Sequence, residues 1–444
     1  MSAVATTRTL EEDVLYYALS LTWVWYVFGA LYVVAPVIAW LLLALWLWRF
    51  LDPSTERLAN RPMTGMVMVW WSGMLVMLVA LVIGHFNWDL GIAATIKSTI
   101  GWMKGWALFA VFVLIGACLH VRPKVLYQAA TNVAVQTLFI IPFLVVAPFI
   151  GLPGTLYVSP IMALGGPGPE YFTVELYGQS YDGSRRWRFF APWGPAAAVA
   201  FGILIPLILR NQSLMLRMLG CFVVVAVILM CKSRLGMIAI PAIFLLSAGL
   251  YRLTDPRVYL LGAITVFAMA LSSELWIPLL LEQIDNVRAM RADSSYVREA
   301  LGRIALHRWW TEAPIWGHGI VERGPHLVEF MPIGSHHSWY GLLFVKGAVG
   351  FLALLLPLLY SWCELTMKAQ KNRSARVALT LMIFISFTTF TENLEILAYI
   401  MWPAFVMIGI ASRERLFNPF RSPLGSTAQR TYEVAPALQP SPAS

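Results

Sequence analysis

The chain has 444 residues, of which 59% are hydrophobic and only 12% are charged. Soluble domains carry roughly 25% charged residues, so this composition excludes an ordinary soluble protein and indicates a membrane protein. The formal net charge of +9 gives no support to nucleic-acid binding, because most of the basic excess lies in loops where a membrane topology explains it.

Apolar segments that are long enough to cross a bilayer recur along the chain. A helical span needs about 20 residues, or somewhat fewer where neighbours shield its ends. The pattern predicts an all-α integral membrane protein with about twelve transmembrane helices. The predicted spans are 14–32, 36–51, 64–84, 98–119, 125–149, 192–209, 214–231, 235–251, 257–274, 339–362, 377–391 and 394–411. The residues before the first span are acidic, so we expect no cleavable signal peptide.

Residues 1–411 are predicted to form one polytopic membrane domain. The remainder, 412–444, is rich in Ser, Pro and Ala, which predicts a disordered cytoplasmic tail. The cysteines show neither metal-ligand spacing nor an obvious extracellular partner, so we expect no disulfide and no zinc site. They are Cys118, Cys221, Cys231 and Cys363.

Sorting the loops onto two sides of the membrane separates their basic residues. Twelve spans place both termini on one side, and more than half of the lysines and arginines fall in the mostly short loops of that side. Short loops rich in Lys and Arg are cytoplasmic, whereas long loops cross the membrane regardless of their charge. The termini are therefore predicted to be cytoplasmic, and two long segments, 151–191 and 275–338, to face the other side.

The first long segment is rich in Gly and Pro, which suits a cover or a substrate channel. Its end, YDGSRRWRFFAPWGP, interleaves Arg185, Arg186 and Arg188 with aromatic residues. Guanidiniums on the outer face, where the positive-inside rule does not act, indicate an anion site. From this segment alone, an interfacial belt against lipid headgroups is an equally good interpretation.

The second long segment contains a predicted helix. A cap at residues 293–295 starts it, and it runs to about Thr311. One face is apolar, which predicts that the helix lies on the membrane domain; the stripe is Leu301, Ile304, Ala305 and Trp309.

Several arginines surround this helix and the eighth span. Arg298 falls in the first turn, where the helix dipole disfavours a cation, and Arg288 and Arg291 come just before it. Arg234 lies at the outer mouth of the eighth span. A solvated or carboxylate-paired arginine is the alternative for each, but their recurrence on one side favours a shared anionic partner.

Most of the histidines also lie in the second long segment: His307, His318, His326, His336 and His337. No pair has the i, i+4 spacing of a helical metal site, so we expect no metal. Successive residues on a helix diverge by about 100°, so only one of His336 and His337 could face a site if the helix has begun.

Lys346 lies inside a span, where an ammonium is costly, and is therefore a functional candidate. Snorkelling to the interface, or pairing with Glu392 or Glu395, are the alternatives.

The sequence carries no GxSxG elbow, no Walker loop and no paired carboxylates at a catalytic spacing. Hydrolase, nucleotide-driven pump and glycosidase functions therefore have no support. The groups that remain are the outer-face arginines and a histidine, and an enzyme that uses an activated lipid diphosphate would need both. Guanidinium forks match phosphate oxygens, and a neutral imidazole can take a proton from a hydroxyl.

Several motifs resemble the O-antigen ligase and O-antigen polymerase superfamily. They are SRxG at Ser233 to Gly236, Arg298 followed by Trp309 or Trp310 and PxxGxG at Pro314 to Gly319, and HSWYGLL from His337 with Gly347 and Gly350 behind it. RFFAPWGP resembles the family's stretch of arginine before Asn-Pro-Asn, but the asparagines are absent here, which leaves the register among Arg185, Arg186 and Arg188 open. The resemblance covers residues 185–362, and the late histidine after a large outer loop is typical of the ligase branch.

The resemblance implies a GT-C-like, inverting, metal-independent glycosyltransferase of the Gram-negative inner membrane, without a cofactor. It would move O-antigen glycan from undecaprenyl diphosphate to a hydroxyl of the lipid A-core oligosaccharide, at the periplasmic face, in lipopolysaccharide biosynthesis. The family's histidine corresponds to His337, which would accept the acceptor proton or orient the acceptor hydroxyl. The diphosphate-binding arginines correspond to Arg186 and Arg288, followed by Arg188, Arg234 and Arg298.

Two related functions differ from this one only in the acceptor: an O-antigen polymerase, and a protein O-oligosaccharyltransferase of the same superfamily. A lipid-linked oligosaccharide transporter is an alternative of a different class. A transporter would place charged residues along a cavity through many spans, whereas here the spans are poor in charge and the unusual residues gather at one face.

Overall fold

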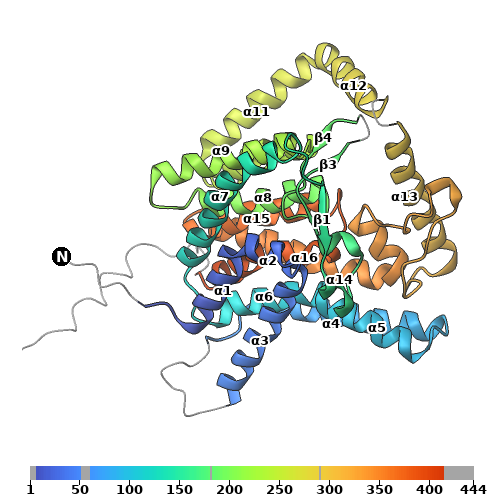
Figure 1. Ribbon diagram of the computed structural model, residues 1–444. Helices are drawn as coiled ribbons and strands as arrows, with labels where there is room; N and C mark the ends of the chain where they lie inside the picture. Colours follow the sequence, from blue (N-terminus) through green and yellow to red (C-terminus); the bar gives the residue numbers. More distant parts are fainter. Residues whose placement is uncertain (1–6, 52–60, 181–182, 290–291, 415–444) are drawn as a thin grey trace, which may run out of the picture.

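The computed structural model describes residues 7–51, 61–180, 183–289 and 292–414, which form a bundle of helices with two small β-sheets (Figure 1). The first helices are α1 (Leu10–Ser20), α2 (Thr22–Val27), α3 (Leu31–Leu51), α4 (Gly65–Asn87), α5 (Gly91–Lys104), α6 (Trp106–Cys118) and α7 (Pro123–Val146). They are followed by α8 (Gly194–Ile208), α9 (Leu214–Met230), α10 (Arg234–Leu250), α11 (Pro256–Leu271), α12 (Ser273–Ala289) and α13 (Ala292–Glu312). The last are α14 (Ser338–Ala369), α15 (Arg373–Thr388) and α16 (Leu394–Ser412).

Each predicted span coincides with a helix or a pair of helices, but the count of about twelve spans is not confirmed. In the described part of the chain, six helices are long and apolar enough to cross a membrane. A seventh span is counted if α11 and the start of α12, which meet at 80°, form one broken span. The shortfall comes from length: α8 has 15 residues, α15 has 16, and α9 and α10 have 17 each. The first predicted span is divided at Leu21 into α1 and α2.

The centre of the bundle is the pair α6 and α16, whose side chains are almost all buried. Gly116 and Gly409 allow the two backbones to touch. A Cβ at Gly116 would lie 2.1 Å from the Val406 carbonyl oxygen, and one at Gly409 would lie 2.1 Å from that of Val113. Small residues at such crossings give the close packing that holds helices together where the hydrophobic effect is weak.

Buried charges at one end of the bundle are paired. Arg49 donates two hydrogen bonds of 3.1 Å to the Glu11 carboxylate, and Lys368 Nζ donates to Glu364. Arg413 donates to backbone carbonyls of the loop after α6. All of these residues belong to segments that the topology prediction puts on one side, and we call this region the paired end.

The segment 151–191 folds at the opposite end of the bundle. It contains two antiparallel pairs of strands, β1 (Thr155–Val158) with β2 (Thr173–Glu175) and β3 (Gly178–Gln179) with β4 (Arg185–Arg186), and the 3-10 helices η2 (Pro160–Leu164) and η3 (Pro169–Tyr171). The Tyr26 hydroxyl donates to the Glu175 carbonyl at 3.0 Å, and the Ser159 hydroxyl donates to the Phe28 carbonyl at 3.0 Å. The described part of the Gly- and Pro-rich segment is therefore a cover that is hydrogen-bonded to α2 and to the residue after it.

The segment 275–338 is more helical than predicted. α12 occupies its beginning, and the predicted surface helix is confirmed as α13. Its buried Ala305 packs against Phe344 of α14, and its buried Leu301 packs against Val328. A short 3-10 helix, η4 (His326–Val328), follows. No residue of α11 is buried, and Figure 1 shows α11 and α12 along the outside of the bundle.

Candidate functional site

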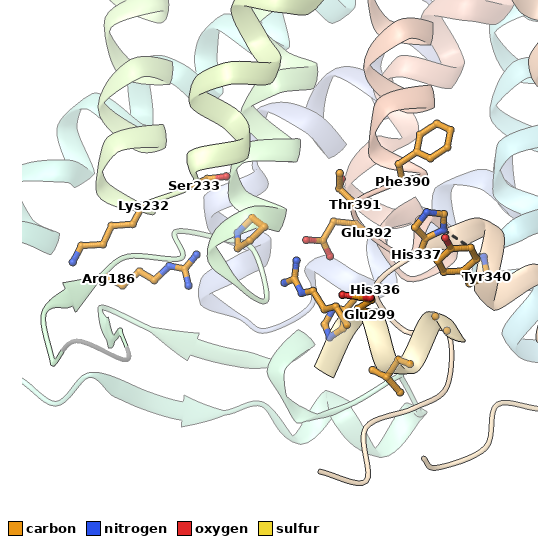
Figure 2. Close-up of a pocket in the computed structure, with 15 residues that line it drawn as sticks. Arg186, Lys232, Ser233, Glu299, His336, His337, Tyr340, Phe390, Thr391 and Glu392 are labelled. Carbon is orange, nitrogen blue, oxygen red and sulfur yellow. Dashed lines mark hydrogen bonds between the residues drawn. The ribbon is translucent and has the colours of Figure 1, made fainter. Parts of the chain in front are cut away.

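A cavity of about 350 Å³ lies at the end of the bundle opposite the paired end. We call it the His337 cavity; it is lined by Arg186, Pro195, Lys232, Ser233, Arg298, Glu299, Leu301, Gly302, Gly334, His336, His337, Tyr340, Phe390, Thr391 and Glu392. These residues come from β4 and the starts of α8, α10 and α13, from the loop into α14, and from the turn between α15 and α16. Figure 2 shows Glu392 with Arg186 and Lys232 on one side and His337 on the other.

Of the three arginines in the SRRWR stretch, Arg186 is the one that lines the cavity. Its Nε donates a 2.8 Å hydrogen bond to the Cys231 carbonyl. Its guanidinium also packs so closely on Gly194 that a Cβ there would lie 2.5 Å from Nη2. The start of α8 and the end of α9 thus fix this guanidinium in place.

The other two arginines of this stretch have different surroundings. Arg188 forms a 3.0 Å salt bridge with Glu175 and donates to the Pro192 carbonyl. The Arg185 guanidinium lies 4.5 Å from the centre of the Phe149 ring. The structure therefore places Arg188, a predicted diphosphate ligand, in the cover, where its charge is neutralised by a carboxylate. The sequence could not predict this, because the pairing depends on how the cover folds and not on a fixed spacing between Glu175 and Arg188.

Arg298 lies in the first part of α13 and lines the cavity, as a partner-binding arginine would. Two further predicted arginines cannot be placed in the same way. Arg288 belongs to α12 and Arg234 is the first residue of α10, but the side chains of both lie outside the described residues. Lys232, which precedes Arg234, lines the cavity and donates a hydrogen bond to Ser184 Oγ.

His337 is the N-cap of α14. Its Nδ1 accepts a hydrogen bond of 3.4 Å from the Tyr340 N–H, and its ring stacks on the Tyr340 ring at 3.9 Å. Burial lowers the pKa of His337, so the ring is neutral at physiological pH. Because Nδ1 accepts, the proton of the neutral ring is on Nε2, which is then a hydrogen-bond donor.

His336 also lines the cavity, and the expectation that only one of the two histidines could face a site, which assumed that the helix had begun, does not apply. The 100° divergence applies within a helix, whereas His337 has extended backbone dihedrals (φ −155°, ψ 113°) and the helix starts after it. Burial, together with the charge of Arg298, lowers the pKa of His336 to about 4. Both imidazoles are therefore neutral.

Glu392 is the residue that sequence analysis did not place in the site. It is 2% exposed, lies in the turn before α16, and accepts a 3.2 Å hydrogen bond from Trp193 Nε1. Burial raises its pKa to about 7, although Arg298, Trp193 and Arg186 act in the opposite direction. A carboxyl that titrates near neutral pH is suited to accepting a proton from a substrate. In the sequence, the feature that could have indicated Glu392 is the presence of two acidic residues in a short turn between apolar spans.

A second cavity of about 620 Å³ adjoins the first and extends towards the centre of the bundle. We call it the Lys346 cavity. It shares Arg186, Pro195, Arg298, Gly334, His336 and Glu392 with the His337 cavity. Its other walls include Lys346, Glu395 and the aromatic residues Trp106, Tyr171 and Trp193. The His337 cavity and the Lys346 cavity therefore share a wall that carries arginines, an imidazole and a carboxyl group.

The PxxGxG motif supports this site through its backbone. α14 is broken at Gly347, whose φ of 63° and ψ of −165° are not helical. Pro314 and Ile315 accept hydrogen bonds from the N–H groups of Ala348 and Val349 after the break. Before the break, Phe344 and Val345 accept bonds from the N–H groups of residues 318 and 319. The motif thus satisfies the backbone groups that the break leaves without helical partners.

His318, within the same motif, has a structural role. Its ring is buried between Trp88 and Phe344, with ring centres 5.0 Å and 4.2 Å away, and its Nε2 lies 2.8 Å from Glu312. In the part of the chain that the structure describes, no cluster of three His, Cys, Asp or Glu side chains could hold a metal ion.

The arrangement is suited to transfer of a group from a phosphorylated donor to a hydroxyl. Arg186 and Arg298 can neutralise phosphate oxygens, His337 can donate through Nε2–H, and Glu392 can take up a proton. When the chain is compared with known proteins, no family model matches it and no curated protein matches it.

Proposed function

We propose that this protein is an O-antigen ligase. It would be an inverting glycosyltransferase that moves O-antigen glycan from undecaprenyl diphosphate to lipid A-core at the periplasmic face of the Gram-negative inner membrane. The observation that carries the proposal is the convergence on one cavity of Arg186 from β4, Arg298 from α13 and His337 from the N-cap of α14. These are the residue types and the chain positions on which the resemblance rests.

In this proposal the donor diphosphate occupies the His337 cavity. Arg186 is held by Cys231 and Gly194, so its guanidinium is oriented before the substrate arrives. Preorganised charge of this kind lowers the cost of developing negative charge on the leaving group. Arg186 and Arg298 remain the diphosphate ligands, and Arg188 is replaced in that role by Lys232, which lines the cavity.

The chemical step is a single displacement. The acceptor hydroxyl oxygen attacks the anomeric carbon from the face opposite the phosphate, the bond to the phosphate oxygen breaks, and undecaprenyl diphosphate leaves. The hydroxyl proton passes to the Glu392 carboxylate. His337, whose Nδ1 is occupied by the Tyr340 N–H, donates from Nε2 to an oxygen of the substrate and orients it. Of the two roles that the sequence allows for His337, the orienting one agrees with this hydrogen bond.

We also propose about twelve spans, with both termini in the cytoplasm. Support for this topology comes from the two ends of the helix bundle, because different sets of charged residues gather at each end. Segments predicted to be cytoplasmic meet at the paired end, and segments predicted to be periplasmic meet at the His337 cavity, at opposite ends of α14 and α16. The shorter helices α8, α9 and α10 lie among longer ones, where protein neighbours can shield their ends.

Reconstitution of the purified protein tests the function directly. Vesicles would receive undecaprenyl diphosphate-linked glycan with either lipid A-core or a second lipid-linked repeat, in the presence of a chelator. We expect glycan on lipid A-core. Product on the lipid-linked repeat alone would make the protein a polymerase, and product that requires metal would contradict the mechanism.

A further inference from the structure

Lys346 carries a buried ammonium for which the described structure provides no contact partner. The residue is 4% exposed and lines the Lys346 cavity. Within the described residues its Nζ makes no hydrogen bond and no salt bridge. The buried Lys368 at the paired end, by contrast, bonds both Glu364 and the Ser412 carbonyl. Since an unpaired buried charge is costly, Lys346 indicates a ligand.

The backbone around Lys346 is also that of a binding site. Lys346 lies eight residues after the start of α14, which places it about 12 Å along the helix axis. α14 breaks at the next residue, Gly347, and the boundary of α5 and α6 breaks at Gly105, where a Cβ would lie 2.6 Å from Glu395 Cγ. Non-helical backbone at this depth is found where protein buries it or where it lines a polar cavity.

The walls of this cavity are suited to a sugar. Trp106, Tyr171 and Trp193 provide flat apolar surfaces with polar edges, and Asn393 and Glu395 provide groups that can bind hydroxyls. The volume of about 620 Å³ falls within the range of ordinary ligand sites. At the end near Arg298, the cavity opens onto the wall shared with the His337 cavity.

We propose that the Lys346 cavity binds the acceptor glycan, and that Lys346 binds an anionic group, a carboxylate or a phosphate, on one of its sugars. The role as acceptor site rests on the proposed function. The two cavities would hold donor and acceptor on either side of Glu392 and His336, so that the acceptor hydroxyl reaches the shared wall. A charge-assisted bond to Lys346 would select acidic over neutral sugars.

Stability distinguishes this role from a structural one. If Lys346 and Glu395 together held the fold, removing the ammonium would leave a buried carboxylate alone and lower the unfolding temperature. If the ammonium is instead kept for a ligand, Lys346→Met removes a desolvated charge and keeps the length of the side chain. The variant should then unfold at a temperature equal to or above that of the unsubstituted protein.

Binding can be measured without turnover. Saturation-transfer NMR on the purified protein would compare galactose with galacturonate and galactose 6-phosphate, which differ from it by one anionic group. We expect at least one anionic sugar to bind about tenfold more tightly than galactose, and Lys346→Met to abolish that difference. Lys346→Arg should retain part of it, and Lys97→Met, at an exposed lysine of α5, should leave it intact. Equal binding of the three sugars, or an unchanged preference in Lys346→Met, would overturn the inference.

A second measurement links the cavity to the reaction. In the transfer assay, Lys346→Met should raise the KM for lipid A-core about tenfold and leave the KM for the donor unchanged. A rise in the donor KM alone would overturn the acceptor assignment. Because sugar binding needs no transfer, Lys346-dependent binding in a protein that transfers nothing would reject the proposed function and leave the anionic sugar site standing.

Discussion

Glu392→Gln should make the protein more stable and much less active. Burial raises the pKa of this carboxyl to about 7 in the folded protein, against 4.5 for an ordinary glutamate. Each pH unit between these values corresponds to about 1.4 kcal/mol, so carrying the ionised carboxylate costs the folded state about 3 kcal/mol. The glutamine amide is uncharged, and its oxygen can still accept the hydrogen bond from Trp193.

The sign of the pH dependence follows from proton binding. Below pH 4.5 the carboxyl is protonated in both the folded and the unfolded chain, so it contributes no difference. Between pH 4.5 and about 7 the folded protein holds its proton more tightly, and stability falls as the pH rises. The gain from Glu392→Gln should therefore be absent near pH 4.5 and reach about 3 kcal/mol at pH 8. Thermal or denaturant unfolding in detergent at the two pH values measures it.

The activity of the same variant tests the role of proton acceptor. The kcat/KM of the unsubstituted protein should rise up to tenfold per pH unit below pH 7 and level off above it, because the carboxylate form is the active one. In Glu392→Gln, kcat/KM at pH 8 should fall about 100-fold to 10,000-fold, and kcat/KM should no longer rise between pH 6 and pH 7. A profile that is already flat above pH 6 would point to a group of lower pKa, such as His337, and would refute the assignment. Activity of the variant within a few-fold of normal would do the same.

Substitutions at the arginines, at His337 and at Gly347 test other parts of the site. Arg186→Ala and Arg298→Ala should each raise the donor KM about tenfold or more, because each removes a charge-assisted bond to the donor. Arg188→Ala should change the donor KM little, because the charge of Arg188 is matched by Glu175. Equal effects of all three substitutions would contradict the geometry. His337→Asn should preserve the cap of α14 and lower kcat about 100-fold. His337→Ala should lower kcat to the same extent and also lower the free energy of unfolding by about 1 kcal/mol. Near-normal transfer by both variants would remove His337 from the mechanism. Gly347→Ala should lower the free energy of unfolding by about 2 kcal/mol or more, because φ is 63° and the new Cβ would lie 2.2 Å from the Ile315 carbonyl oxygen. Gly101→Ala, with open space around the new Cβ, should be neutral or stabilising in the same unfolding assay.

Hydropathy predicted the positions of the helices, because helices that cross a bilayer must be long and apolar. The predicted spans lie on helices, and the predicted helix at 293–311 is α13, whose Ala305 packs against Phe344 of α14. The breaks at Leu21, Gly105 and Gly347 were not predicted. Apolar composition is the same on both sides of each break, and what stabilises the break at Gly347 is a set of hydrogen bonds from a segment some thirty residues earlier.

The site was predicted less completely than the fold. Arg186, Arg298 and His337 could be named because each lies in a recognisable stretch on one side. Arg188 could not be distinguished from Arg186 by sequence, because a salt bridge across the cover decides between them. Glu392 was not named as a site residue, since its raised pKa arises from burial by neighbours that only the folded chain assembles.

The break in α14 also constrains the order in which the molecule can assemble. The segment from Pro314 to Gly319 is synthesised before α14, yet four of its backbone hydrogen bonds require the two halves of that helix. Until α14 has been synthesised, these groups lack the partners that they have in the folded protein. The positions of Lys346 and His337 are therefore fixed only at a late stage of biogenesis, after most of the bundle is in the membrane. A chain interrupted between Gly319 and α14 would contain every predicted arginine of the site and still lack the cavity.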